Sequence, residues 1–555
     1  MDKEHSYTIG IDFGTLSARA AVVRVSDGKT LGTAVHAYES AVMDKTLSCA
    51  DGQELPADFA LQNASDYIRA IKETVPAALQ EAGVSASEVI ALGVDTTSAS
   101  VVFAAEDGTP MSEIEQFRNN PHAYVKLWKH HGAAEQADRI QSLAAERQEK
   151  WLARYGGIIS SELLLPKALE VFEKAPEVYK ATGAITDAMD WINWRLTGVH
   201  KQSAGPSGYK RIYQDGEYPS TEYLEALAEG FGDVYEQKMS APIVQLAEPV
   251  AGLSEEAAEW TGLKVGTTVV AGSIDAHAHA LGVNAIEDGV MTIIAGTSSV
   301  LLVSDKDFHF VPGVFGTVDG GICPGKWGYE AGQTAVGDIF GWFKDTFVPL
   351  RYYEEADEKG INVHDLLTQK AMEQNIGEHG LVALDWHNGN RSILSDPRLA
   401  GMVLGKTLST QPEDIYRALI EASIFGGKTI IDNFVEHGVE IKEVVIAGGL
   451  LKNPIYTQGY ADVTGLPISI SATEQAGALG SAIFAAVAAG AYEDVYEAAA
   501  AMGKKIEAKY KPIPENVEAY RPLYETYREL HDYFGRENTD IMHRLRKIRN
   551  EARSK

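Results

Sequence analysis

The sequence predicts an α/β protein of at least two domains, in which helices cover the sheets. The chain has 555 residues, well above the ~250 to 300 at which a single hydrophobic core stops growing. Short apolar runs bounded by Gly and Asp alternate with amphipathic runs of helical period along most of its length. A strand, glycine turn and strand pattern also occurs near the start and again near the middle, which indicates two domains on a related plan.

The first expected element is a strand hairpin over residues 7–25. Apolar residues alternate from Ile9 to Phe13, Gly14 and Thr15 interrupt them, and a second apolar run follows before the next turn. This pattern is typical of two strands joined by a tight turn.

The same pattern recurs over residues 89–110 and, without its aspartate, over residues 289–305. We therefore expect a hairpin at each place. Amphipathic helices are predicted over 56–83 and 412–438, and each leads into a further apolar strand.

We expect the main domain boundary near residue 283. It separates an N-terminal domain, 1–283, from a C-terminal domain, 284–514. The remaining segment, 515–555, is rich in Tyr, Glu and Arg and is predicted to be a helical appendage.

Composition narrows the possible partners. The 78 acidic and 49 basic residues give a net charge of −29, which disfavours nucleic acid and anionic membranes as partners. No apolar run approaches the ~18 residues of a membrane span, and the N-terminus lacks the pattern of a secretion signal. Cys49 and Cys323 are too few for a disulfide framework, so we expect a cytoplasmic protein. The basic run at 543–555 is interpreted as a solvated helix end.

Two glycine and hydroxyl turns are candidates for phosphate binding. Backbone amides and a hydroxyl at Gly14 and Thr15 suit phosphate oxygens. The second turn consists of Gly296, Thr297 and Ser298. Two such turns, one from each domain, can bind one polyphosphate from opposite sides.

Asp12, in the strand before the first turn, is the candidate Mg²⁺ ligand, directly or through water. For this turn alone, the polar edge of a hairpin explains the residues equally well. Gly448 and Gly449 follow an apolar strand and permit close approach of a flat ring, so with Asn453 they are candidates for the adenosine side. Paired glycines after a strand are also often only a turn.

Asp275 ends a predicted apolar strand near the domain boundary and is the candidate general base. In an alternative interpretation, His277 and His279 share one face of a strand and bind a metal with Asp275, as in metal-dependent hydrolases. The segment 422–429 lacks the first glycine of a P-loop and lies in a helical run. No G-x-G-x-x-G motif supports dinucleotide chemistry.

Taken together, "GIDFGT", "AGTSS", "AGGLLKN" and Asp275 resemble the FGGY family of carbohydrate kinases over nearly the whole chain. The resemblance implies two actin-like (ribonuclease H-like) domains, with mixed sheets flanked by helices, that enclose ATP and a sugar in the cleft between them. It implies Asp275 as catalytic base, Mg²⁺ near Asp12, and phosphates oriented by Thr15, Gly296 and Thr297.

Longer stretches, among them 119–140, 207–213 and 383–405, are most similar to family members that act on L-ribulose. The resemblance thus implies ATP-dependent phosphorylation of the L-ribulose C5 hydroxyl, a step of arabinose catabolism, and is compatible with a homodimer. Another ketopentose, D-ribulose or xylulose, is the first alternative. An actin-like nucleotide switch without sugar chemistry is the second.

Sugar hydroxyls need fixed polar partners. The candidates are Thr96, Thr97, Lys210 and Glu330, each with a solvated surface position as the alternative. Trp128 is a further candidate for the pocket wall, and a core tryptophan is equally plausible there. Glu170 departs from the family, because many members have Trp at that position.

Overall fold

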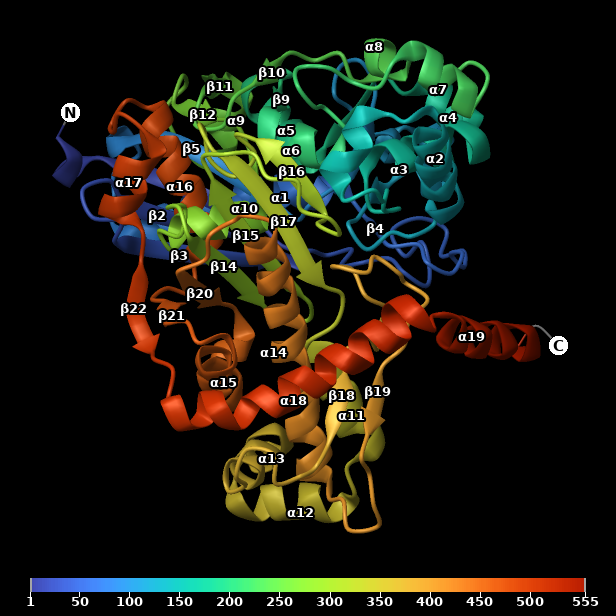
Figure 1. The fold of residues 1–555 in the computed structure, drawn as a ribbon. Coiled ribbons are helices and arrows are strands. Elements are labelled where there is room, and N and C mark those ends of the chain that lie inside the picture. Colours follow the sequence, from blue (N-terminus) through green and yellow to red (C-terminus); the bar gives the residue numbers. More distant parts are fainter. Residues whose placement is uncertain (1, 554–555) are drawn as a thin grey trace.

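The computed structural model describes residues 2–553 and contains two large mixed sheets, one in each half of the chain (Figure 1). In the first sheet the strand order is β11-β12-β5-β1-β2-β3, with β13 also paired to β5. The strands are β1 (Tyr7–Phe13), β2 (Ser17–Arg24), β3 (Thr30–Ala37), β5 (Val89–Thr96), β11 (Pro249–Gly252), β12 (Thr268–Val270) and β13 (Ser273–Ile274). β1, β2 and β3 are antiparallel, whereas β5 runs parallel to β1 and to β12.

The second sheet repeats this plan in the order β16-β17-β15-β14-β20-β21-β22. Its strands are β14 (Val290–Ala295), β15 (Ser299–Asp305), β16 (Gly316–Asp319), β17 (Trp327–Gln333), β20 (Glu443–Ala447), β21 (Ile468–Ser471) and β22 (Lys505–Tyr510). β14, β15 and β17 are antiparallel, and β20 runs parallel to β14. The prediction of an α/β protein with two related, mixed sheets is confirmed.

Helices cover both sheets and also join them. Those that pack on the sheets or on one another are α1 (Ala64–Ala82), α5 (Ala188–Thr197), α9 (Glu255–Thr261), α10 (Asp275–Gly282), α11 (Gly337–Phe347), α12 (Leu350–Lys359), α13 (Val363–Met372), α14 (Pro412–Glu436), α15 (Pro454–Thr464), α16 (Ala476–Ala488) and α17 (Val495–Met502). Although α16 lies between β21 and β22 of the second sheet in sequence, it packs on β1 and β5 of the first sheet and against α10. The approach is so close that a Cβ on Gly10 would lie 1.7 Å from the Ala478 carbonyl oxygen.

A smaller subdomain, which we call the cap, lies beside the first sheet and has its own hydrophobic core. It comprises β4 (Leu61–Gln62), β6 (Val101–Ala104), β7 (Val125–Lys126), β8 (Ala184–Asp187), α2 (Ala134–Arg147), α3 (Leu164–Lys174), α4 (Pro176–Ala181), α7 (Thr221–Leu227) and α8 (Val234–Lys238). The chain returns from the cap through β9 (Gln202–Ser203), α6 (Ala204–Lys210) and β10 (Ile243–Val244).

The hairpin predicted over 89–110 is wrong, because β5 and β6 belong to different sheets. Both edges of β5 are already occupied by β1 and by β12 and β13, so the next strand has no edge on which to return. Ala99 adopts a left-handed backbone, with φ of 51°, where the chain leaves β5 for the cap.

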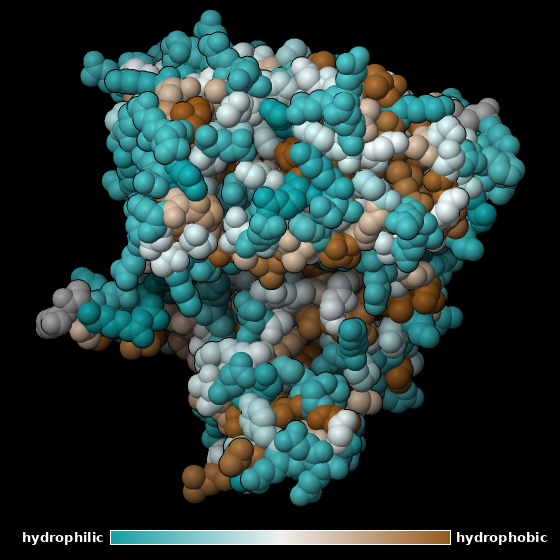
Figure 2. All heavy atoms as spheres, turned by 180° about the vertical axis from the view of Figure 1, so that it is seen from behind, coloured by the Kyte–Doolittle hydropathy of each residue, from teal (hydrophilic) through white to brown (hydrophobic). Residues whose placement is uncertain are grey.

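The C-terminal residues form α18 (Pro514–Asp532), a short π-helical turn and α19 (Asp540–Arg553), the last of which projects from the body (Figure 1). Tyr520 and Tyr527 of α18 are buried against the second sheet's core, near the small β18 (Val382–Leu384) and β19 (Met402–Leu404) pair. Within residues 2–553, none of the helices is both long and apolar enough to cross a membrane. From behind, the mostly hydrophilic surface is hollowed between the larger upper body and the lower part of the molecule (Figure 2).

Candidate active site

Strand pairing brings three aspartates to one edge of the first sheet. In the parallel register Asp12 of β1 is paired with Asp95 of β5, and Ser273 of β13 is paired with Asp95 on its other side. Asp275 follows β13 directly as the first residue of α10. Because these parallel strands end together, Asp12, Asp95 and Asp275 share the carboxyl edge, where ligands of α/β sheets commonly bind.

Asp275 has the environment of a proton acceptor that works near neutrality. Its surface is partly accessible, and its Oδ1 accepts a hydrogen bond of 2.7 Å from the Ala276 amide. Burial, reinforced by the Asp12 carboxylate, raises the pKa of Asp275 to about 7. A carboxylate with such a pKa is ionised above neutral pH and is a stronger base than an ordinary aspartate.

Asp12 and Asp95 form a carboxylate pair at the base of this edge. Arg19 Nε lies 3.6 Å from an Asp12 oxygen. Asp95 is fully buried, and its Oδ2 accepts a hydrogen bond of 2.5 Å from Ser481 of α16. Burial and the neighbouring Asp12 raise the pKa of Asp95, while its Oδ1 has no hydrogen-bond partner. Sequence reasoning did not select Asp95, although its Gly-apolar-Asp pattern repeats that of Asp12.

This pair fits a hydrated Mg²⁺. Mg²⁺ in nucleotide sites is usually held by one or two carboxylates, several waters and substrate phosphates. Asp12 and the unpartnered oxygen of Asp95 beside it would be the two carboxylate donors. Gly477 of α16 leaves room there, because a Cβ at this position would lie 3.2 Å from Asp12 Oδ2.

The first glycine turn joins β1 to β2 and is partly open to solvent. The Gly14 amide donates to the Ser17 carbonyl at 3.0 Å. Thr15 accepts a hydrogen bond of 3.3 Å at Oγ1 from the indole nitrogen of Trp128. Trp128 is half-buried and therefore is not a core tryptophan.

The second glycine turn joins β14 to β15 in the matching position of the second sheet. The carbonyls of Gly296 and Thr297 accept hydrogen bonds from Gly337 and Val336, which anchors the start of α11 at the turn. Thr297 is exposed, Ser298 partly so, and a Cβ on Gly296 would meet nothing within 4 Å. Open space therefore adjoins this turn.

The loop after β20 lies next to the second turn. Gly448 has φ of 101°, and a Cβ there would lie 2.4 Å from the carbonyl oxygen of Ala295, which precedes the turn. Gly449 has nothing within 4 Å of its Cβ position. The Asn453 side chain caps α15 by accepting from the Ile455 and Tyr456 amides, so its oxygen is engaged within the protein.

A buried charged cluster connects the two halves of the chain. Lys210, the last residue of α6, places Nζ 3.1 and 3.2 Å from the carboxylate oxygens of Glu330 on β17. His277 Nε2 lies 3.3 Å from Glu330 Oε2. Burial by itself raises the pKa of Glu330, but Lys210 and His277 outweigh it and hold that pKa below its usual value. The charges of Lys210 and Glu330 also influence the pKa of Asp275.

Thr96 ends β5 and is paired with Phe13 of β1 and with Ile274, the residue before Asp275, and Thr97 follows it. The Thr97 amide donates to the Phe13 carbonyl at 3.1 Å, and its hydroxyl lies 2.8 Å from that of Ser100. Thr96, Thr97, Lys210 and Glu330 are all buried, so a solvated surface position is wrong for each of the four.

The interpretation of His277 and His279 as a metal-binding pair on one strand face is wrong. Both lie on α10, where residues two apart point about 200° from each other. His277 faces Glu330, whereas His279 Nδ1 lies 2.9 Å from the Asp275 carbonyl oxygen. Among residues 2–553, no group of three or more His, Cys, Asp or Glu side chains is arranged to hold a metal ion.

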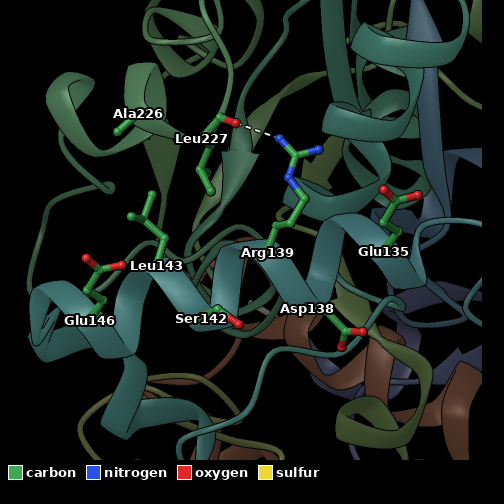
Figure 3. Close-up of a pocket in the computed structure, with 8 residues that line it drawn as sticks. All are labelled: Glu135, Asp138, Arg139, Ser142, Leu143, Glu146, Ala226 and Leu227. Carbon is green, nitrogen blue, oxygen red and sulfur yellow. Dashed lines mark hydrogen bonds between the residues drawn. The ribbon is translucent and has the colours of Figure 1, made fainter.

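A surface pocket on α2 lies apart from this site (Figure 3). Arg139 crosses it and donates a hydrogen bond of 2.6 Å to the Leu227 carbonyl. The lining residues are Glu135, Asp138, Arg139, Ser142, Leu143, Glu146, Ala226 and Leu227. None of them is a candidate site residue.

Comparisons with known proteins match nearly the whole chain. The model of the N-terminal domain of the FGGY family of carbohydrate kinases matches residues 7–282, and that of its C-terminal domain matches residues 291–489. A ribulokinase of Mycolicibacterium smegmatis is 49% identical and covers 98% of this chain and 97% of its own. A ribulokinase of Bacillus licheniformis is 45% identical over 96% of this chain and 98% of its own.

Solved structures share the fold at much lower identity. A ligand-bound xylulose kinase from Lactobacillus acidophilus superposes with a TM-score of 0.78 at 18% identity, covering 97% of this chain and 100% of its own. A glycerol kinase from Plasmodium falciparum, solved with ADP, superposes with a TM-score of 0.72 at 14% identity. The match covers 94% of this chain and 98% of that chain.

Proposed function

This chain belongs to the FGGY family of carbohydrate kinases, and on that premise we propose that it transfers the γ-phosphoryl group of ATP to ribulose. L-ribulose is the proposed sugar and its C5 hydroxyl the acceptor, which gives L-ribulose 5-phosphate and ADP. The observation that supports this most strongly is the environment of Asp275. This carboxylate has a raised pKa and lies at a sheet edge, near the ion pair of Lys210 and Glu330.

Asp275 accepts the proton of the acceptor hydroxyl. As that proton leaves, the hydroxyl oxygen bonds to the γ-phosphorus and the bond from phosphorus to the bridging oxygen of ADP breaks. Bound Mg²⁺ would neutralise phosphate charge. Asp12 and Asp95 would hold it through water, which leaves Asp275 free as the base.

The other candidates are assigned by position. Lys210 and Glu330 bind sugar hydroxyls, since both are charged, buried and close to Asp275. The Thr96 and Thr97 segment forms an adjacent wall. Phosphates lie between the two turns, with Thr15 on one side and Gly296, Thr297 and Ser298 on the other. Gly448, Gly449 and the backbone near Asn453 face the adenosine.

We further propose a cytoplasmic location and a homodimer. Both cysteines are free thiols in the structure, which suits a reducing compartment. Light scattering on the purified protein tests the dimer, and fractionation of the producing cells tests the location.

The test of the function is an ADP-release assay with the four 2-ketopentoses as separate acceptors. L-ribulose is expected to give the highest kcat/KM. Preference for D-ribulose or a xylulose would change the proposed sugar but leave the proposed kinase activity standing. ADP release that does not depend on any sugar would instead favour a nucleotide switch.

A further inference from the structure

A fully buried lysine of the cap, Lys167, holds the chain where it leaves β5. Lys167 lies on α3, and its Nζ donates to the Ala99 carbonyl at 2.8 Å and to the Leu127 carbonyl at 2.7 Å. The two carbonyls are 28 residues apart in sequence and come from separate segments. One ammonium group therefore links these two segments.

The first segment carries the sugar-wall candidates. Ala99 follows Thr96 and Thr97 and has φ of 51°, a conformation that costs a non-glycine residue about 1 kcal/mol or more. Such a backbone persists only where its surroundings fix it. The hydrogen bond from Lys167 to the Ala99 carbonyl helps to fix this backbone.

The second segment carries Trp128, the candidate for the pocket wall. Leu127 precedes Trp128, whose indole donates to Thr15 Oγ1. The Leu127 carbonyl also accepts from the His130 amide at 3.0 Å, so two donors fix its position. A shift of Leu127 would move Trp128, the candidate for the pocket wall, whereas the turn at Thr15 is held independently by the Gly14 amide, which donates to the Ser17 carbonyl.

Placing an amine here is costly. Burial lowers the pKa of Lys167 to about 7, opposed by the Glu162 carboxylate. The hydrogen-bond partners of Nζ are both carbonyl oxygens rather than carboxylates. An apolar residue would fill the same space without that cost, so the two bonds are the feature that requires a lysine.

We propose that Lys167 is a positioning residue for sugar binding, which fixes the Thr96 to Ala99 turn and the Leu127 to Trp128 segment as one wall of the sugar site. Lys167 is too deeply buried to touch a ligand and acts through these backbone groups. The inference rests on the proposed function, since it needs a sugar at that wall.

The test is Lys167→Met, which keeps the apolar stem and removes both hydrogen bonds. The KM for the sugar is expected to rise about tenfold or more, with the KM for ATP within about twofold of wild type. Lys238→Met is the control, because Lys238 also lies in the cap and donates to one backbone carbonyl, that of Thr182 at 2.6 Å, which belongs to neither segment. The control is expected to leave both KM values unchanged.

A second variant separates positioning from general loss of stability. Ala99→Gly relieves the left-handed strain, so adding it to Lys167→Met is expected to recover part of the sugar KM. If the Met variant does not fold, Lys167→Gln replaces it, since an amide still donates to one carbonyl. Equal losses for sugar and ATP, an unchanged sugar KM, or no recovery with Ala99→Gly would overturn the proposal.

The failure of this inference and of the proposed function are distinguishable. Wild-type turnover of a ketopentose tests the function alone. If wild type prefers a sugar other than L-ribulose, that sugar is used for the same KM comparison.

Discussion

At the scale of the residue, the chemistry depends on one carboxylate whose surroundings raise its basicity. Asp275 lies where burial and Asp12 both disfavour its charge. The opposite holds for Glu330, whose negative charge is retained by Lys210 and His277. Two carboxylates with pKa values shifted in opposite directions are suited to different tasks, here proton transfer and sugar binding.

Asp275→Asn is expected to lower kcat on the order of 10²-fold or more, because the amide cannot accept the hydroxyl proton. The affinity for ATP, measured by calorimetry, is expected to stay within about threefold of wild type, since no phosphate contact is assigned to this side chain. Near-normal turnover by the variant would remove Asp275 from the role of base.

The pH dependence follows from the same pKa. With a pKa of about 7, Asp275 is protonated and inactive as a base in acid, so kcat/KM is expected to fall about tenfold per pH unit below 7 and to level off above it. With an aspartate of ordinary pKa as the base, kcat/KM would stay constant down to about pH 4. A profile flat from pH 5 to pH 8 would contradict the assignment.

At the scale of the element, the two glycine turns show how far the sequence predicts the structure. Strands around both turns were predicted from local alternation, and the structure has them as β1 with β2 and β14 with β15. The hairpin predicted over 89–110 was wrong, because alternation predicts a strand but not which sheet it joins. His277 and His279 were placed on a strand for a related reason, since Ala-His-Ala-His alternates with period two although α10 is helical.

Gly296→Val tests the second turn as a phosphate site. The fold is expected to accept the side chain, because nothing lies within 4 Å of the Cβ position, but the branch would occupy the space of a phosphate. Calorimetry is expected to show loss of ATP binding with little change in melting temperature. Gly341→Val on α11, where the Cβ position is equally open, is the control and should still bind ATP.

The contact of α10 with α16 depends on residues without a Cβ. A Cβ on Gly480 would lie 1.8 Å from the Ala278 carbonyl oxygen. Gly480→Ala is therefore expected to lower the free energy of unfolding by about 1–3 kcal/mol, measured by urea denaturation. Gly490→Ala, just beyond α16, has an open Cβ position but a φ of 73°, so it gives the cost of backbone strain alone. A smaller loss for Gly480→Ala than for this control would argue against close helix packing.

At the scale of the whole molecule, the site exists only where separate parts of the chain meet. Asp12, Asp95 and Asp275 come from the first sheet, Glu330 from the second, and Lys210 from the segment that returns from the cap. Sequence motifs indicated most of these residues one at a time. Asp95 and Lys167 were not selected, because their significance lies in neighbours far away in sequence, Ser481 for Asp95 and Ala99 for Lys167.

The pair of Lys210 and Glu330 is expected to stabilise the junction as well as to bind sugar. Lys210→Met leaves a buried carboxylate without its main partner and is expected to cost about 3–5 kcal/mol of unfolding free energy. Adding Glu330→Gln removes the stranded charge, so the double variant is expected to be more stable than Lys210→Met alone. A double-mutant cycle with additive losses would show that the two side chains do not interact.

The most direct measurement is phosphorus NMR of a reaction that contains the protein, ATP, Mg²⁺ and L-ribulose. The predicted result is ADP and a sugar phosphate in equal amounts, with the phosphate on C5 and with no product from the Asp275→Asn variant on the same time scale. ATP converted to ADP and inorganic phosphate without a sugar phosphate, or a phosphate at another carbon, would contradict the arrangement of base, sugar and nucleotide described above.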